Sequence, residues 1–399
     1  MVPKNFQKKV LSNGITVIHE FRDLPVISLS ITNKFGGAFE DSKIKGIAHF
    51  IEHLVFTGTK TRTHEDISRE IEKKGGILNA FTSHDVTSFY FKLPAEHIFA
   101  GMDILVDILN NPTFEMERFN KEKKVIIEEI KMYHDSPQRY VFEQIEANLF
   151  DKPFGEGVIG SEKTINALSR DFVASYFSEM YNPKNFIVTL VGQADFKKVC
   201  QYLEDNFKPK KGIPSPKIIK KHNKDTTQSR PGIDQAHFVL AFHAPLQTEK
   251  AHTVLEVLDA YLANGMSSRL FLEIREKRGL AYAIKSSLNT EKSYSYYSIY
   301  VGTTKEAVPE VKKLILEEFQ KVKDMTASDL AEAKERLIGL EKISQEESSN
   351  VMNSLLFSEL IKKAEDYYDF EKKISAVTLS EVKAMAKLKS FSTAAIVPK

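Results

Sequence analysis

The chain has 399 residues, of which 42% are hydrophobic and 28% are charged, and its net charge is +2. This composition is that of a soluble globular protein of two or more domains, and the near-neutral charge argues against nucleic acid as the main partner. A membrane-spanning helix needs about 18 consecutive apolar residues, and no apolar run in the sequence is nearly that long. No membrane partner is therefore expected.

The first residues and the single cysteine bear on the compartment. Residues 1–6 lack the apolar core of a signal peptide and lead directly into strand-like sequence. Cys200 is the only cysteine, so no intrachain disulfide can form. It lies in a helical pattern, where a small core residue is expected rather than a nucleophile. A cytoplasmic location is therefore predicted.

The first half of the chain mixes strand and helix patterns. Ser12-Asn13-Gly14 separates two strand-like runs, and Asn-Gly between such runs predicts a hairpin. Gly75-Gly76 ends a helical pattern that starts at His64. Further strands are predicted at residues 26–32, 77–82, 86–93 and 186–191, and further helices at residues 95–110, 114–134, 137–149, 172–180 and 196–207.

A polar, basic stretch rich in proline and glycine follows, and it predicts a linker at residues 211–232. An N-terminal domain of residues 1–210 and a C-terminal domain of residues 233–399 are expected on either side. The second half repeats the order of the first, with helices predicted from Ser268 to Lys277 and at 352–361, and strands at 281–288 and 294–301. The predicted fold class is α+β, with two similar sandwich-like units in which helices cover an antiparallel-rich sheet.

One helical pattern carries candidate metal ligands. Residues 46–56 are apolar except for His49-x-x-Glu52-His53, and residues i, i+3 and i+4 share one face of a helix. Two imidazoles and a carboxylate on a buried helix need partners, and a zinc ion with a catalytic water would satisfy them. Hydrogen bonds to the backbone in an ordinary core helix are the alternative. The second half contains no such motif, so one metal site per chain is expected.

A third ligand is expected from the acidic helix at residues 122–130. Glu122 and Glu129 lie two turns apart and therefore share a face, with Val125 and Ile126 nearby. Taken alone, this pattern is equally that of a charged amphipathic helix.

The sequence resembles the pitrilysin and mitochondrial-processing-peptidase family of zinc peptidases, the inverzincins. The resemblance rests on residues 46–53, Gly75-Gly76 with residues 79–83, Glu122-x6-Glu129 and Arg275-x6-Tyr282. It covers nearly the whole chain in the family's order, and the chain looks like a short, two-domain, prokaryotic-type member. The resemblance implies a zinc-dependent metalloendopeptidase.

The resemblance also implies roles for these residues. His49, His53 and Glu129 correspond to zinc ligands, with one Zn²⁺ per chain, and Glu52 corresponds to the general base. Glu122 matches an acid that supports the site. Glu128 is adjacent to Glu129, and the seven-residue offset from Glu122 favours Glu129 as the ligand.

Substrate contacts are implied in both halves. A peptide in this family resembles an extra strand laid on an exposed sheet edge, and the matching residues are Asn79, Ala80 and Phe81. Arg275 and Tyr282 resemble the pair that contacts substrate and steadies the oxyanion. By spacing alone, the first stretch is equally a core strand, Arg275 a surface helix charge and Tyr282 a strand residue.

The length of the chain bears on its assembly. Family members enclose extended or unfolded peptides with four such units, and this chain has two. A homodimer is therefore expected, clamshell-like, in which the partner's second half supplies Arg275 and Tyr282 to each site. The alternatives are a non-catalytic partner or scaffold subunit of a heterodimeric peptidase, and a structural zinc protein.

Overall fold

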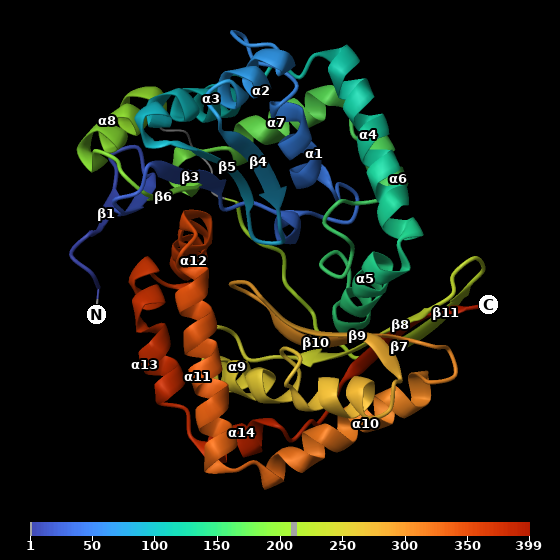
Figure 1. Cartoon of the computed structure of the whole chain (residues 1–399). Helices are drawn as coiled ribbons and strands as arrows, with labels where there is room; N and C mark the ends of the chain where they lie inside the picture. The colour runs from blue at the N-terminus through green and yellow to red at the C-terminus, as the bar shows by residue number, and fades with distance from the viewer. Residues whose placement is uncertain (1, 209–213) are drawn as a thin grey trace. The chain divides into compact units, whose positions relative to one another are not determined.

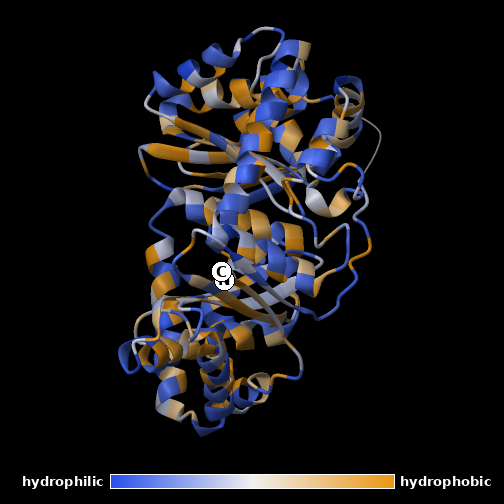
Figure 2. Cartoon of the chain, turned by 90° about the vertical axis from the view of Figure 1, so that its right-hand side faces the viewer, coloured by the Kyte–Doolittle hydropathy of each residue, from blue (hydrophilic) through white to orange (hydrophobic). Residues whose placement is uncertain are grey.

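The computed structural model describes residues 2–208 and 214–399, which form two compact units (Figure 1). The first unit contains residues 1–131, 156–218 and 344–367, and the second contains residues 132–155, 219–343 and 368–399. Each unit has its own sheet and its own core, and Figure 2 shows hydrophobic residues along the strands of both sheets. Each unit is therefore assembled from segments that are far apart in sequence.

The first unit is built on a six-stranded sheet in the order β1-β2-β6-β3-β5-β4. All neighbours are antiparallel except β2 and β6, which run parallel. The predicted hairpin at Asn13-Gly14 joins the first two strands, and Gly14 takes the positive φ of 92° that this turn requires. The strands are β1 (Phe6–Val10), β2 (Thr16–Glu20), β3 (Val26–Asn33), β4 (Ile77–Thr82), β5 (Thr87–Pro94) and β6 (Phe186–Val191).

Helices cover both faces of this sheet. Ile27, Leu29 and Ile31 of β3 lie in the apolar core beneath α1 and α3, whereas the alternate residues point to the opposite face. There α12 (Ser348–Ile361) packs on β3 and β6 (Figure 1). Its Ser348 hydroxyl lies 2.8 Å from that of Ser28. The other helices are α1 (Ile47–Val55), α2 (His64–Glu72), α3 (Ile98–Asn110), α4 (Met116–Asp135), α6 (Glu162–Ala167), α7 (Arg170–Met180) and α8 (Phe196–Asn206).

The second unit repeats this topology in a five-stranded sheet of order β7-β11-β8-β10-β9. Its single parallel pair, β7 and β11, corresponds to β2 and β6, and β9 occupies the edge that β4 occupies in the first sheet. The strands are β7 (Asp225–Arg230), β8 (Ala236–His243), β9 (Ala281–Thr290), β10 (Ser295–Thr303) and β11 (Ser392–Pro398). The helices are α5 (Pro137–Leu149), α9 (Lys250–Leu262), a π-helix (Phe271–Glu276), α10 (Val308–Lys321), α11 (Ala327–Ser344), α13 (Phe370–Ser375) and α14 (Leu379–Met385).

The predicted fold class is confirmed, because each unit has an antiparallel-rich sheet covered by helices. The two units do not coincide with the two predicted domains, each of which was a continuous stretch of sequence on one side of the linker at residues 211–232. Helix α5 packs on β8 and β11 of the second sheet, and α12 packs on the first. Residues 225–230 of the predicted linker form β7, since they pair with β11, and residues 211–213 lie outside the described residues.

Within the described residues, none of the helices is both long and apolar enough to cross a membrane.

Candidate metal centre

Helix α1 places its two histidines side by side. Apart from Glu52, its other side chains are apolar and buried, which fixes the helix against the core. His49 is 8% exposed, and the ring centroids of His49 and His53 lie 4.7 Å apart. The i, i+4 spacing therefore brings the two imidazoles to one face, as predicted from the sequence.

The first turn of α1 is capped by a residue from outside the helix. Gly46, which precedes it, has φ 96°, and a Cβ there would lie 2.6 Å from the carbonyl oxygen of Ile159. Glu40 accepts hydrogen bonds from the backbone N–H groups of Gly46 (3.0 Å) and Ala48 (2.7 Å). The Lys45 ammonium lies 3.7 Å from the same buried carboxylate. Burial raises the pKa of Glu40 to about 7, although Lys45 and these N–H groups oppose the shift.

Helix α4 brings the third candidate ligand to the histidines. The Glu129 Oε2 atom lies 3.7 Å from Nε2 of His49 and 3.6 Å from Nε2 of His53. Glu122, two turns earlier, accepts from Nδ1 of His53 at 3.4 Å. Glu128 points elsewhere, because its side chain is 71% exposed and pairs with Lys131 at 2.8 Å. The geometry therefore singles out Glu129 as the candidate ligand, whereas the spacing alone only favoured it over Glu128.

The two histidines differ in their electrostatic surroundings. Burial, with a smaller contribution from His53, lowers the pKa of His49 to about 3, so this ring is neutral, as a metal ligand must be. Burial also opposes protonation of His53. The hydrogen bond to Glu122 and the charges of Glu52 and Glu129 outweigh it and raise the pKa of His53. The carboxylate of Glu122 thus fixes the orientation of His53 through its second ring nitrogen.

The motif's remaining carboxylate, Glu52, is held by the neighbouring strand. Thr82 at the end of β4 donates a hydrogen bond to Glu52 Oε2 at 2.5 Å. Burial raises the pKa of Glu52, whereas the Thr82 hydroxyl and His53 oppose that shift. A carboxylate with a raised pKa is suited to accept and return a proton near neutral pH.

The donor set of His49, His53 and Glu129 fits a zinc ion. Two nitrogens and one carboxylate oxygen form a three-ligand set that leaves a coordination position for water. Donors bound to one zinc at about 2.0–2.2 Å each lie no more than about 4.4 Å apart, and the two histidine–glutamate distances fall within this limit. Among the described residues, this is the one cluster of three or more such side chains.

The predicted substrate strand is an edge strand. In the described part of the chain, β4 pairs with β5 on one side and with no strand on the other. Ala80 packs against the core, and the side-chain oxygen of Asn79 accepts from the backbone N–H of Ala80. The ring of Phe81 lies on the other face, 6.4 Å from Phe357 of α12. The main chain of β4 is thus placed to pair with an extended peptide.

Arg275 and Tyr282 belong to the second unit. The predicted helix from Ser268 to Lys277 is a π-helical turn at Phe271–Glu276, and Arg275 lies on it. Its guanidinium lies 4.9 Å from the ring centroid of Phe271 and 3.9 Å from Glu276, which is itself exposed. Tyr282 lies on β9, 45% exposed.

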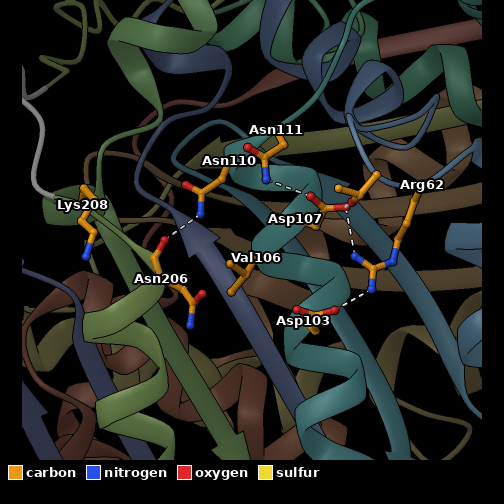
Figure 3. Close-up of a pocket in the computed structure, with 9 residues that line it drawn as sticks. Arg62, Asp103, Val106, Asp107, Asn110, Asn111, Asn206 and Lys208 are labelled. Atoms are coloured by element: carbon orange, nitrogen blue, oxygen red, sulfur yellow. Dashed lines mark hydrogen bonds and ion pairs between the residues drawn. The ribbon is translucent and has the colours of Figure 1, made fainter.

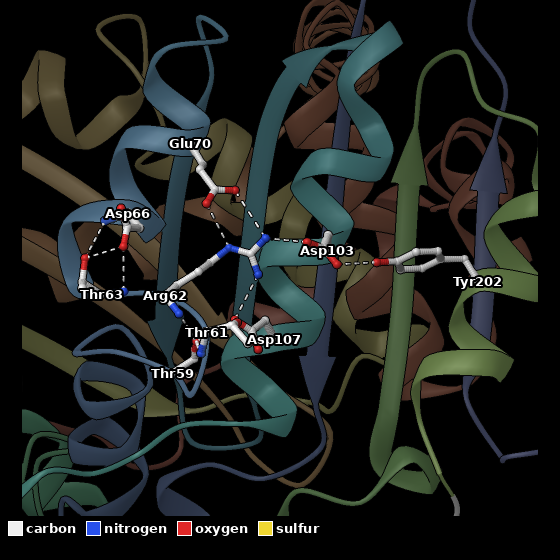
Figure 4. Close-up of polar contacts among 9 residues, drawn as sticks. All are labelled: Thr59, Thr61, Arg62, Thr63, Asp66, Glu70, Asp103, Asp107 and Tyr202. Carbon is white, nitrogen blue, oxygen red and sulfur yellow. Dashed lines mark hydrogen bonds and ion pairs between the residues drawn. The ribbon is translucent and has the colours of Figure 1, made fainter.

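A pocket of about 540 Å³ in the first unit contains none of the predicted site residues (Figure 3). Arg62 in its wall donates to Glu70, Asp103 and Asp107, and Asp103 also accepts from the Tyr202 hydroxyl (Figure 4). One guanidinium pairs with three carboxylates in this network, which ties the turn before α2 to α3. The pocket is lined by Thr61, Arg62, Asp103, Val106, Asp107, Asn110, Asn111, Asn206 and Lys208.

Two residues of this centre were not identified as site residues from the sequence. Thr82 shares a strand face with Ala80, and this alternation could have placed it against the helix that carries Glu52. Glu40 precedes α1 by a loop, and no local pattern relates it to the first turn of the helix.

Comparison with known proteins identifies the family. The model of the family described as "Insulinase (Peptidase family M16)" matches residues 23–162, and that of the "Peptidase M16 inactive domain" matches residues 167–337. The first match contains the candidate metal centre, and the second contains Arg275 and Tyr282.

Relatives of similar length support this assignment. A Rickettsia felis protein named "Uncharacterized zinc protease" is 30% identical over 350 residues, which cover 84% of this chain and 82% of the relative. A Mycobacterium tuberculosis protein of the same description is 30% identical over 403 residues, covering 96% and 90%. The crystal structure of a protease from Helicobacter pylori shares the fold, with a TM-score of 0.92 over 100% of both chains at 22% identity. The chain therefore belongs to peptidase family M16.

Proposed function

We propose that the protein is a zinc-dependent metalloendopeptidase that cleaves extended or unfolded peptides. The observation that carries the proposal is the convergence of Glu129 on His49 and His53, with Glu52 on the same helix as the two histidines. His49, His53 and Glu129 would hold one zinc ion per chain. A bound zinc ion would acidify a water molecule and polarise the scissile carbonyl.

The other roles in the reaction are assigned to residues of the chain itself. Glu52, steadied by Thr82, accepts a proton from the attacking water and returns it to the leaving amine. Glu122 holds the orientation of His53. The free edge of β4 at Asn79, Ala80 and Phe81 pairs with the peptide backbone, which favours extended substrates over folded ones. Arg275 and Tyr282 bind the substrate and steady the oxyanion.

Glu52→Gln tests the proposal. The variant is expected to retain zinc, because Glu52 is not among the three converging ligands, and to lose nearly all hydrolysis of an unfolded fluorogenic peptide. Metal content is measured by mass spectrometry on the protein used for the assay, with chelator-treated wild type as a reference. Wild-type rates in the zinc-loaded variant would refute the assigned role of Glu52. A zinc-loaded wild type without activity would instead favour a non-catalytic partner or scaffold subunit.

We further propose a homodimer in which each centre uses Arg275 and Tyr282 of the partner copy. Glu52→Gln and Tyr282→Phe chains, each impaired alone, then complement one another when unfolded together and reassembled. Half of the dimers are mixed and carry one intact site of two, so about a quarter of the wild-type activity is expected. An active monomer of 45.3 kDa, or no recovery in mixed dimers, would contradict this arrangement.

A further inference from the structure

We propose that His237 and Tyr300 form a hydrogen-bonded relay behind Tyr282 that fixes its hydroxyl group as an outward-pointing donor. The inference rests on the proposed function, in which Tyr282 steadies the oxyanion. All three residues lie in the second unit, on strands β8, β10 and β9. His237 and Tyr300 are thereby positioning residues that act through Tyr282.

A β-bulge presents Tyr282. Gly302 of β10 pairs with Ala283 and Thr303 pairs with Ala281, so Tyr282 is the extra residue of β9. Such a bulge redirects a side chain out of the regular alternation. The ring of Tyr282 lies over Gly302, where a Cβ atom would be 2.3 Å from its Cζ atom. Glycine at this position thus leaves the space that the ring occupies.

Tyr300 supports the hydroxyl of Tyr282 from inside the unit. It precedes Gly302 by two residues and therefore lies on the same face of β10. Its hydroxyl oxygen is 3.2 Å from that of Tyr282, and the residue is 1% exposed. The ring of Phe142, on α5, stacks on the ring of Tyr300, with the two centroids 5.8 Å apart. Burial raises the pKa of Tyr300, so this hydroxyl keeps its proton.

His237 completes the relay. It pairs with Gly302 across β8 and β10, and its Nδ1 atom lies 2.8 Å from the Tyr300 hydroxyl. Burial lowers the pKa of His237, which favours the neutral ring, with a proton on only one nitrogen. With that proton on Nδ1, the ring donates to Tyr300.

The direction of the hydrogen bonds decides what Tyr282 can do, because a tyrosine hydroxyl has a single hydrogen. In the outward direction, His237 donates to Tyr300, Tyr300 donates to Tyr282, and the hydrogen of Tyr282 remains for the substrate oxygen. In the inward direction, Tyr282 gives its hydrogen to Tyr300 and has none to offer. The outward relay is therefore the one compatible with an oxyanion donor, and each bond polarises the next.

The protonated nitrogen of His237 provides a test that does not depend on activity. In the full chain with ¹⁵N-labelled histidine, the nuclear magnetic resonance spectrum is expected to show the proton of His237 on Nδ1 near neutral pH. The His237→Gln spectrum assigns the signal. A proton on Nε2, with Nδ1 as the acceptor, would reverse the relay and overturn the proposal.

Kinetics test whether Tyr300 acts through Tyr282. Tyr282→Phe is expected to lower kcat about 100-fold, and Tyr300→Phe is expected to lower kcat about 10-fold with KM unchanged. The double variant is expected to match Tyr282→Phe alone, since the relay has nothing left to orient. Tyr297→Phe is the matched control, because this tyrosine of the same strand lies on the opposite face from Tyr300 and donates to Asp259 at 2.6 Å. It is expected to lower the unfolding midpoint while leaving kcat unchanged.

The outcomes separate the relay from the proposed function. Losses that multiply in the double variant, or a wild-type kcat in Tyr300→Phe beside an impaired Tyr282→Phe, overturn the relay alone. A wild-type kcat in Tyr282→Phe overturns both the relay and the role assigned to Tyr282. A zinc-loaded wild type that hydrolyses no peptide counts against the proposed function, and the His237 spectrum still decides the direction of the relay.

Discussion

Glu122 and Glu128 show how neighbouring carboxylates on one helix differ in what they contact. Glu122 reaches Nδ1 of His53, while Glu128 points to solvent and pairs with Lys131. A carboxylate bonded to the second nitrogen of a ligand histidine fixes its ring and raises its basicity. The helical period placed Glu122 and Glu129 on one face, but it did not reveal that the two carboxylates contact different nitrogens of the same ring.

Glu122→Gln is therefore expected to weaken zinc affinity about 10- to 100-fold, because the neutral amide holds the His53 ring less firmly. Competition with a chromophoric chelator measures the dissociation constant. Glu128→Gln is the control on the same helix and should bind zinc as the wild type does. Equal affinities for all three proteins would show that Glu122 does not support the centre.

Helix α1 depends on a cap from outside the helix. Its preceding residue, Gly46, has no side chain to satisfy the first N–H groups, and Glu40 takes over that function from within the core. The apolar positions of α1 and its His-x-x-Glu-His spacing were evident from the sequence. The cap was not, because Glu40 reaches the helix through a loop, and no periodic pattern connects the two.

Glu40→Gln is expected to destabilise the fold by about 2–4 kcal/mol, because the amide replaces one acceptor oxygen by a donor and removes the charge beside buried Lys45. Urea unfolding at pH 8 measures the free energy of unfolding with the wild-type carboxyl ionised. The neighbouring Asp41→Asn serves as control, since Asp41 is 64% exposed and pairs with Lys217 at the surface. A Glu40→Gln variant as stable as Asp41→Asn would contradict the capping role.

At the scale of the whole molecule, the two halves of the sequence exchange helices. The first half contributes α5 to the second unit, and the second half contributes α12 to the first unit. The sequence patterns predicted helices at 137–149 and 352–361, close to the observed α5 and α12, but assigned each to its own half of the chain. Amphipathic periodicity reports that a helix has an apolar face and not which sheet that face covers. Contacts such as Lys92–Glu347 and Ser28–Ser348 join residues more than 250 positions apart, which local patterns do not encode.

A fragment of residues 1–208 is therefore expected not to fold cooperatively by itself. Without α12, the side of β3 and β6 that this helix covers lies open to water. The fragment also lacks the buried apolar side chains of α12, worth about 1.5–3 kcal/mol each. Circular dichroism during heating measures the transition. Co-expression with residues 214–399 should restore a single sharp transition, and a sharp transition in the isolated fragment would argue against this dependence.

The same exchange of helices has a consequence for synthesis on the ribosome. Strand β6 emerges well before α12, and at about 5–20 residues per second the delay is roughly 10–30 s. Throughout that interval the nascent first sheet has one face uncovered, so its folding cannot be completed during translation of the first half. A premature stop codon after residue 343 would therefore remove the part that completes the first unit, although all three candidate zinc ligands would already have been translated.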